Sequence, residues 1–183
     1  DVAQHETNTT VDAAGLPLYD TLLTLQADTG DLRPALAESW QMGADGLSVT
    51  FKLRRGVKFH ATPWFKPTRE LNAQDVLFSF QRMMDKGHWA HAAARRGFPV
   101  WAGMEMGGMV RSVEAPDPMT VRFTLARPEL PFLTNLAITP IGAVLSAEYA
   151  ARLAAAGKLE QLDSQPVGTG PFVFRSYQGK SVI

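Results

Sequence analysis

The chain has 183 residues, of which 45% are hydrophobic and 20% are charged, and this composition is typical of a globular protein with a buried core. Lysine and arginine together number 18, as do aspartate and glutamate, so no overall charge favours nucleic acid or an anionic membrane as a partner. The sequence contains no cysteine, which excludes disulfides, thiolate metal sites and cysteine nucleophiles. No apolar run is long enough to span a bilayer and the start lacks the features of a signal peptide, so we expect a soluble chain that has been processed or trimmed.

The first element that we predict is a helix over residues 11–25. Its apolar residues recur at helical spacing: Leu16, Tyr19, Leu22 and Leu23. Asp12 can cap the start of this helix, and Pro17 is tolerated because it falls near that start. We therefore expect the helix to bury one face.

Two segments predict β-hairpins. From residue 37 to residue 54, two apolar-rich runs flank an AspGly pair at 45–46, and the second run alternates apolar and polar residues. Residues 110–125 form two alternating runs around the turn-forming sequence AlaProAspPro. We therefore expect strands to occur in pairs.

The remaining segments predict helices and one strand. Asn72 can cap a helix over 71–85, which places apolar residues such as Val76 and Phe80 on one face. The other predictions are helices over 129–137 and 146–162, the second interrupted near Gly157, and a strand over 166–178 that follows a glycine turn. This order predicts a mixed α/β (α+β) architecture without a dinucleotide-binding fold. Because the last predicted strand has no sequence after it to cover its apolar faces, we expect the chain to be part of a longer protein.

Three sequence blocks occur in order along the chain: LAESWQMGADGLSVTFKLRRGVKFH (36–60), FKPTRELNAQDVLFSFQRM (65–83) and LDSQPVGTGPFVFRSY (162–177). They resemble blocks of the dipeptide-binding and Sap-type peptide-binding proteins of Gram-negative bacteria, which are family 5 solute-binding proteins of ABC transporters. Residues 9–23 and 119–137 fit the same family, so the resemblance extends over nearly the whole chain. It implies a bilobal protein that closes on its ligand like a hinged clamp.

The resemblance also implies how the chain is organised and what it does. Residues 1–183 would form part of lobe I, with residues 36–165 approximating the extra α/β subdomain of this class, and the second lobe would lie outside the chain. The implied function is periplasmic binding of dipeptides or oligopeptides, in the Gram-negative cell envelope, for delivery to ABC permease subunits in the inner membrane. We expect no cofactor, no bound metal, no catalytic residue and no nucleic-acid partner.

The same resemblance implies ligand-binding residues in two segments. Thr9 and Thr10 fall in a stretch that faces the cleft in the family, where hydroxyl groups and nearby amides would bond a peptide. Phe98 and Trp101 fall in an aromatic loop that lines the pocket and that usually carries tyrosines. Phe98 and Val100 lack the hydroxyl donors of those tyrosines, which favours an apolar or bulkier ligand and keeps haem open as cargo. The charged anchors for the peptide termini are expected mainly from the second lobe.

Four other features have a functional and a structural interpretation. The GlyThrGly sequence at 168–170 resembles a fragment of a phosphate loop, but no GxxxxGK[ST] motif and no helix follow it, which favours a turn. His88 and His91 could share a metal, although no third ligand lies at a suitable spacing. The methionines of residues 104–109 could bind copper or fill gaps in the packing. For His60 we expect a structural hydrogen bond.

The leading hypothesis is therefore a binding protein for peptides, and not an enzyme. The alternatives are a haem-binding member of the same family and a ligand-sensing domain of a regulatory protein. A hydrolase is disfavoured because the sequence has neither a G-x-S-x-G nucleophile elbow nor a recognisable pair of catalytic carboxylates.

Overall fold

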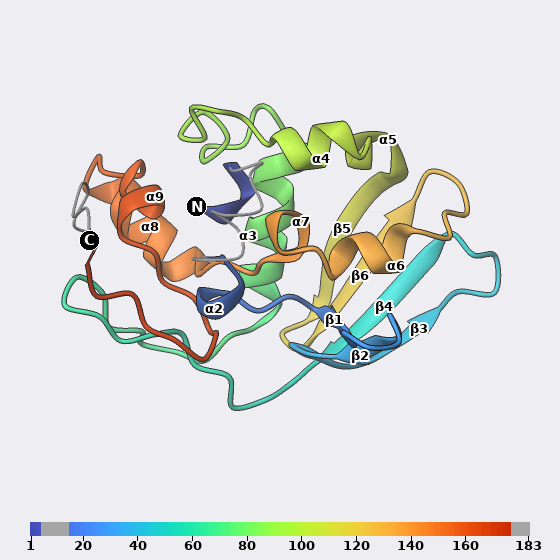
Figure 1. Ribbon diagram of the computed structural model, residues 1–183. Coiled ribbons are helices and arrows are strands. Elements are labelled where there is room, and N and C mark those ends of the chain that lie inside the picture. The colour runs from blue at the N-terminus through green and yellow to red at the C-terminus, as the bar shows by residue number, and fades with distance from the viewer. Residues whose placement is uncertain (5–14, 177–183) are drawn as a thin grey trace.

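The computed structural model describes residues 1–4 and 15–176, and its largest sheet has four antiparallel strands in the order β3-β4-β6-β5 (Figure 1). The strands are β3 (Ala37–Met42), β4 (Ser48–Leu53), β5 (Val110–Asp117) and β6 (Thr120–Leu125). The two predicted hairpins are confirmed, because β3 pairs with β4 and β5 pairs with β6. The β4–β6 pairing, which brings Phe51 opposite Val121, then joins the hairpins into one sheet.

Alternation along the strands gives this sheet one apolar face. In β4 and β6 every second residue is almost fully buried: Val49, Phe51, Leu53, Val121, Phe123 and Leu125. Side chains on the other face include Thr50 and Arg122, which line a shallow polar depression together with β3 residues. The sheet therefore has one face toward the core and one toward solvent.

Helix α3 (Ala73–Met84) covers the apolar face of the sheet (Figure 1). The predicted cap is confirmed, because the Asn72 side chain accepts a hydrogen bond from the backbone N–H of Gln74 at 2.9 Å. From the middle of the helix, Phe80 meets Phe123 edge to face with ring centroids 4.9 Å apart. The aromatic contact and the cap together fix α3 against β6.

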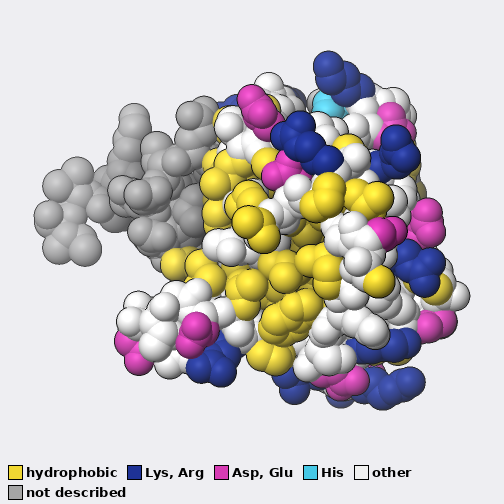
Figure 2. All heavy atoms as spheres, turned by 90° about the vertical axis from the view of Figure 1, so that its right-hand side faces the viewer, with side chains coloured by type: hydrophobic (Ala, Val, Ile, Leu, Met, Phe, Trp, Pro, Cys, Tyr) yellow, Lys and Arg dark blue, Asp and Glu magenta, His cyan; other side chains and the backbone are white. Residues whose placement is uncertain are grey.

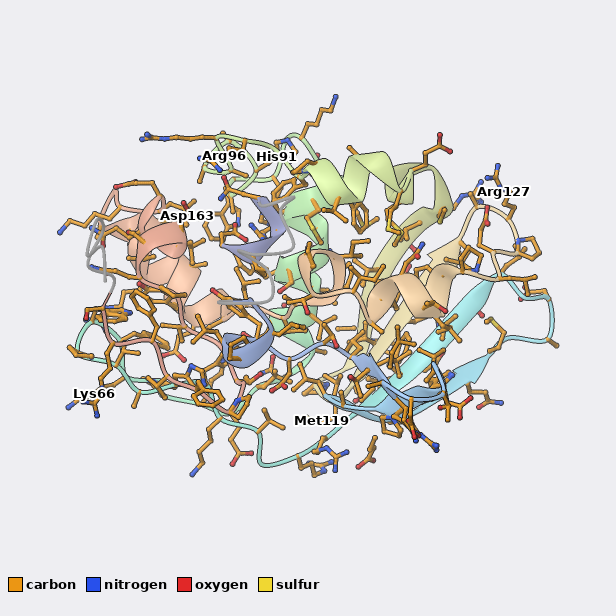
Figure 3. All side chains as sticks on the ribbon, viewed as in Figure 1. Lys66, His91, Arg96, Met119, Arg127 and Asp163 are labelled. Carbon is orange, nitrogen blue, oxygen red and sulfur yellow. The ribbon has the colours of Figure 1, made fainter. Side chains whose placement is uncertain are left out.

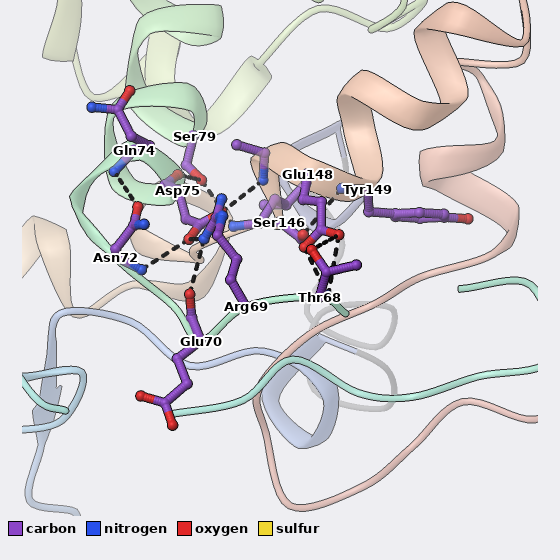
Figure 4. A network of polar contacts seen from close by, with 12 residues as sticks. Thr68, Arg69, Glu70, Asn72, Gln74, Asp75, Ser79, Ser146, Glu148 and Tyr149 are labelled. Carbon is purple, nitrogen blue, oxygen red and sulfur yellow. Dashed lines mark hydrogen bonds and ion pairs between the residues drawn. The ribbon is translucent and has the colours of Figure 1, made fainter. Parts of the chain in front are cut away.

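The carboxylate of Asp75, in the first turn of α3, joins this helix to the helix that begins at residue 147 (Figure 4). It receives two hydrogen bonds from the guanidinium of Arg69, at 2.6 and 2.8 Å. It also accepts the backbone N–H groups of Asn72 at 3.0 Å and of Ala147 at 2.9 Å. This fully buried carboxylate thus accepts hydrogen bonds from three residues, two of them just before α3 and one at the start of the helix that begins at residue 147.

The remaining helices are short, and they lie around α3 and along the sheet. They are α4 (Pro99–Gly103), α5 (Met106–Met109), α6 (Phe132–Leu136), α7 (Thr139–Gly142), α8 (Ala147–Ala155) and α9 (Gln161–Ser164). The predicted helices over 129–137 and 146–162 are confirmed in shortened form, and the second is interrupted at Gly157, where φ is +67°. Mixed α/β architecture is confirmed, with one hydrophobic core that extends from η1 (Val2–Gln4) to Val167.

The predicted helix over 11–25 is wrong in its described part. The chain forms only a short helix, α2 (Leu16–Leu18), and then extends into β1 (Leu23–Leu25), which pairs with β2 (Leu32–Pro34). The backbone carbonyls that a helix would use internally accept bonds from distant segments instead. The carbonyl of Leu18 accepts from Gly170, and that of Asp20 accepts from Val144. Tertiary hydrogen bonds and burial therefore override the helical spacing of the leucines.

The predicted strand over 166–178 does not form within its described residues, 166–176. The backbone N–H of Phe172 bonds to Pro17, but no ladder with a second strand follows. Phe172 and Val173 are 65% and 49% exposed. An alternating pattern needs a neighbouring strand to become a sheet, and the described residues place none beside this segment.

Candidate functional site

Two of the four predicted ligand-binding residues can be located. Thr9 and Thr10 lie outside the described residues. Phe98 immediately precedes α4, and Trp101 lies within that helix. Their side chains are only 6% and 5% exposed, so they form the inner side of the loop, whereas Ala102 and Gly103 at its end are exposed.

The Phe98 ring packs against a charged residue that sequence reasoning missed. Arg82, in the last turn of α3, places its guanidinium carbon 5.0 Å from the centroid of the Phe98 ring and 6.0 Å from that of Phe78. Arg82 is 1% exposed. Burial lowers the pKa of Arg82 to about 10, which leaves the guanidinium charged at neutral pH. A buried cation between two aromatic faces gains a favourable interaction with both rings.

Asp1 is the ionic partner of Arg82. Two hydrogen bonds, at 2.5 and 3.0 Å, join the guanidinium to the two carboxylate oxygens. The same carboxylate accepts the backbone N–H of Ala3 and the side-chain amide of Gln4, both at 3.2 Å. The short turn η1 is therefore folded around the carboxylate that Arg82 holds.

His91 contacts both Arg82 and Phe98. Its Nδ1 donates a hydrogen bond of 2.8 Å to the backbone carbonyl of Arg82, and its ring meets Phe98 edge to face at 5.4 Å. The side-chain oxygen of Gln4 accepts the backbone N–H of Arg96 at 3.5 Å. Figure 3 shows His91 and Arg96 on the same side of the molecule, above η1. We call Asp1, Gln4, Arg82, His91 and Phe98 the Arg82 cluster.

The two histidines of the HWAH sequence make contacts with different residues. His88 accepts the backbone N–H of Ala90 through Nδ1 at 3.2 Å, and its ring packs against Phe78 and Trp89. Partial burial lowers the pKa of His88, which favours the neutral imidazole. Among the described residues, no group of three or more His, Cys, Asp or Glu side chains is arranged to hold a metal ion.

The predicted packing role of the methionine loop is supported at Met106. Its side chain is fully buried, and its sulfur accepts a hydrogen bond of 3.5 Å from the side-chain amide of Asn135. Met104, by contrast, is 37% exposed. Because Met106 is already engaged in the core, its thioether is unavailable to a shared copper site without repacking.

The glycine turn at 168–170 crosses the chain at Leu18 in very close contact. The N–H of Gly170 bonds to the Leu18 carbonyl at 3.0 Å. The His60 ring bridges the turn, because Nδ1 accepts the N–H of Gly168 at 3.3 Å and Nε2 donates to the carbonyl of Gly170 at 2.7 Å. Thr169 donates to the Asp20 carboxylate at 2.8 Å. The structural hydrogen bond predicted for His60 is confirmed, and the turn has a structural use.

Apolar side chains also gather on the face of the molecule shown in Figure 2. The exposed large apolar residues of the described chain include Leu25 at 39%, Met42 at 41% and Leu130 at 100% exposure. A surface of this kind is a candidate contact surface for protein. Among the described residues, none of the helices has the length and apolar character needed to cross a membrane.

The arrangement places two buried aromatic side chains, Phe98 and Trp101, beneath an exposed loop end, and Phe98 packs against a buried ion pair. Solved binding proteins share this architecture. A dipeptide-binding protein from Pseudoalteromonas sp. SM9913, in complex with Met-Leu, superposes with a TM-score of 0.93 at 38% identity, over 97% of this chain and 35% of that one.

Curated relatives share the sequence to a similar extent. Di/tripeptide-binding protein 4 of Pseudomonas aeruginosa is 51% identical over 97% of this chain and 33% of its own length. Heme-binding protein A of Haemophilus influenzae is 45% identical over 96% of this chain and 32% of its own length. The chain thus spans about a third of the length of these relatives.

The sequence model of the bacterial extracellular solute-binding proteins, family 5 (middle), matches residues 31–183. The chain belongs to this family of solute-binding proteins, and the resemblance seen in the sequence is confirmed.

Proposed function

We propose that the protein carrying this chain binds dipeptides or short oligopeptides in the periplasm and delivers them to an ABC importer. The observation that carries the proposal is the 51% identity, over 97% of the chain, to a di/tripeptide-binding protein. The neighbour bound to Met-Leu supports the same ligand class. Binding without chemical conversion is part of the proposal, since the relatives are named as binding proteins.

The chain would supply one wall of the ligand cleft. In this proposal residues 36–165 approximate the extra subdomain of lobe I, and the second lobe provides the opposite wall and the anchors for the peptide termini. Generalist recognition of a peptide relies on its backbone and termini and leaves room for variable side chains. The partners would be the peptide and the ABC permease subunits of the inner membrane.

The proposed ligand-binding residues are Thr9, Thr10, Phe98 and Trp101. Because Phe98 and Trp101 are almost fully buried, they would define the shape of the wall from its inner side and meet the ligand only at their edges. The exposed end of the same loop, from Ala102 to Met104, would form the outer surface of this wall.

Haem is the second candidate ligand. The observation that favours it is the 45% identity to Heme-binding protein A, and the aromatic loop without tyrosine hydroxyls at Phe98 and Val100 is consistent with an apolar ligand. The relatives reported above are binding proteins, which gives the ligand-sensing alternative no support.

Native mass spectrometry of the full-length protein, as purified, tests the choice between these ligands. A spread of small peptide masses retained by the protein supports peptide capture. A single retained mass equal to that of haem, restored by added haem after removal, would replace peptide by haem. No retained mass, and none after addition of either ligand, would refute both.

A further inference from the structure

Arg82 holds together three parts of the chain that are far apart in sequence. Its guanidinium bonds to Asp1, 81 residues earlier, and lies over the ring of Phe98, 16 residues later. Its backbone carbonyl accepts the hydrogen bond from His91. Gln4 of η1 also accepts a hydrogen bond from the backbone N–H of Arg96, but that contact involves no ion pair and no ring. The contact through Arg82 combines an ion pair, hydrogen bonds and packing on the Phe98 ring.

The geometry of this contact is rigid for two reasons. The guanidinium is planar and forms a two-pronged contact with the carboxylate, so the direction of Asp1 from α3 is fixed as well as its distance. Both side chains are 2% exposed, so water cannot replace either partner and the pair cannot separate without leaving a buried charge.

Both proposed ligand-contact segments lie next to this pair in the chain. The turn η1 directly precedes the sequence that holds Thr9 and Thr10, and Phe98 begins the loop that leads into α4. A change in the contact between Arg82 and Phe98 would therefore shift the start of the loop that leads into α4.

We propose that Arg82 is a positioning residue of the ligand wall, which sets ligand affinity through Asp1 and Phe98 without touching the ligand. This inference rests on the proposed function. It predicts that changes at Arg82 alter binding more than their effect on overall stability explains.

Arg69 provides a matched control for the test. It also pairs through both guanidinium nitrogens with a buried aspartate, Asp75, but that pair lies at the opposite end of α3 and joins the helix to α8. Arg69→Met and Arg82→Met thus each leave a buried carboxylate without its guanidinium, although the Arg69 side chain is 32% exposed and that of Arg82 is 2% exposed.

The experiment uses the full-length protein with Arg82→Met, Arg82→Lys, Asp1→Asn and Arg69→Met. Thermal unfolding ranks their stabilities, and titration with the dipeptide Met-Leu, at a temperature where all are folded, measures affinity. We expect Arg82→Met to weaken binding by about tenfold and Arg69→Met by less than about twofold. Arg82→Lys keeps the charge but not the planar fork, so we expect it also to weaken binding. Equal affinity losses for Arg82→Met and Arg69→Met, or wild-type affinity in Arg82→Lys, would overturn the proposal.

Hydrogen exchange of the ligand-free proteins separates this inference from the proposed function. Loss of amide protection in residues 97–104 in the Arg82 and Asp1 variants, but not in Arg69→Met, supports the positioning role. Unchanged protection in that loop would refute it, whichever variants fold. If the wild-type protein binds no dipeptide, the proposed function fails while the exchange result still decides whether Arg82 orders the loop.

Discussion

Gly168 is one of the described glycines at which the fold leaves no room for a side chain. A Cβ atom there would lie 1.8 Å from the Leu18 carbonyl oxygen and 2.8 Å from its carbon, and both are backbone atoms that cannot turn aside. We expect Gly168→Ala to lower the free energy of unfolding by about 1–3 kcal/mol, as overpacking does in other cores. Urea denaturation of the full-length protein measures this loss.

Gly103→Ala is the matched control for that substitution. A Cβ atom at Gly103 meets nothing within 4 Å, and the residue lies in α4, where alanine is favoured. Its stability should stay the same or rise slightly. Similar losses in both variants would show that the close crossing at Leu18 does not constrain the turn.

Two buried tyrosines predict a dependence of stability on alkaline pH. Burial raises the pKa of Tyr149 to about 12, and it also raises the pKa of Tyr19. The folded state therefore holds the protonated phenols more strongly than the unfolded state, whose tyrosines titrate near pH 10. This contribution to stability is complete below pH 10 and is lost as the pH rises toward the folded-state pKa values.

Ultraviolet absorbance of tyrosinate measures this effect directly. We expect two of the three tyrosines to ionise only well above pH 10, together with loss of the folded state. Tyr149→Phe should shift the alkaline midpoint of unfolding upward, because it removes one late-titrating group. Ionisation of all three tyrosines near pH 10 with the fold intact would contradict the expectation.

Among the elements, α3 covers the apolar face of the sheet, and the buried carboxylate in its first turn joins it to α8. Asp75 accepts hydrogen bonds from Arg69, Asn72 and Ala147. The Asn72 side chain accepts backbone N–H groups of its own first helical turn, those of Gln74 and Asp75. We expect Asp75→Ala to cost about 3–5 kcal/mol of stability, since it leaves buried partners unpaired. Asn72→Ala should cost about 1 kcal/mol. Chemical denaturation of both variants tests the ranking, and equal costs would refute the central place of Asp75.

Elements whose stabilising contacts are local could be predicted from the sequence. The two hairpins follow from alternation and turn residues, and α3 follows from its cap and periodicity, because each needs only neighbouring residues. The segment that contains Leu22 and Leu23 could not be predicted in this way. Its backbone carbonyls accept hydrogen bonds from residues 36–37, which are distant in sequence. Apolar residues at helical spacing can also be buried from an extended backbone, so the spacing alone does not identify a helix.

At the scale of the whole molecule, the difference between local and long-range contacts also explains which features of the candidate site could not be predicted from the sequence. Phe98 and Trp101 were named through a family resemblance, but their burial by the fold was not foreseen. No pattern in the sequence pairs Arg82 with Asp1, since 81 residues separate them. From the sequence alone, an arginine in the last turn of an amphipathic helix is expected to be exposed to solvent, and only the tertiary structure shows that it is buried.

The measurement that tests the central claim most directly is a calorimetric titration of the full-length protein with a dipeptide, Met-Leu, beside the same amounts of free methionine and leucine. We expect saturable binding of one dipeptide with a dissociation constant of about 1 μM or below, and no comparable binding of the free amino acids. Absence of dipeptide binding at about 1 mM, with tight binding of haem or of neither ligand, would contradict it.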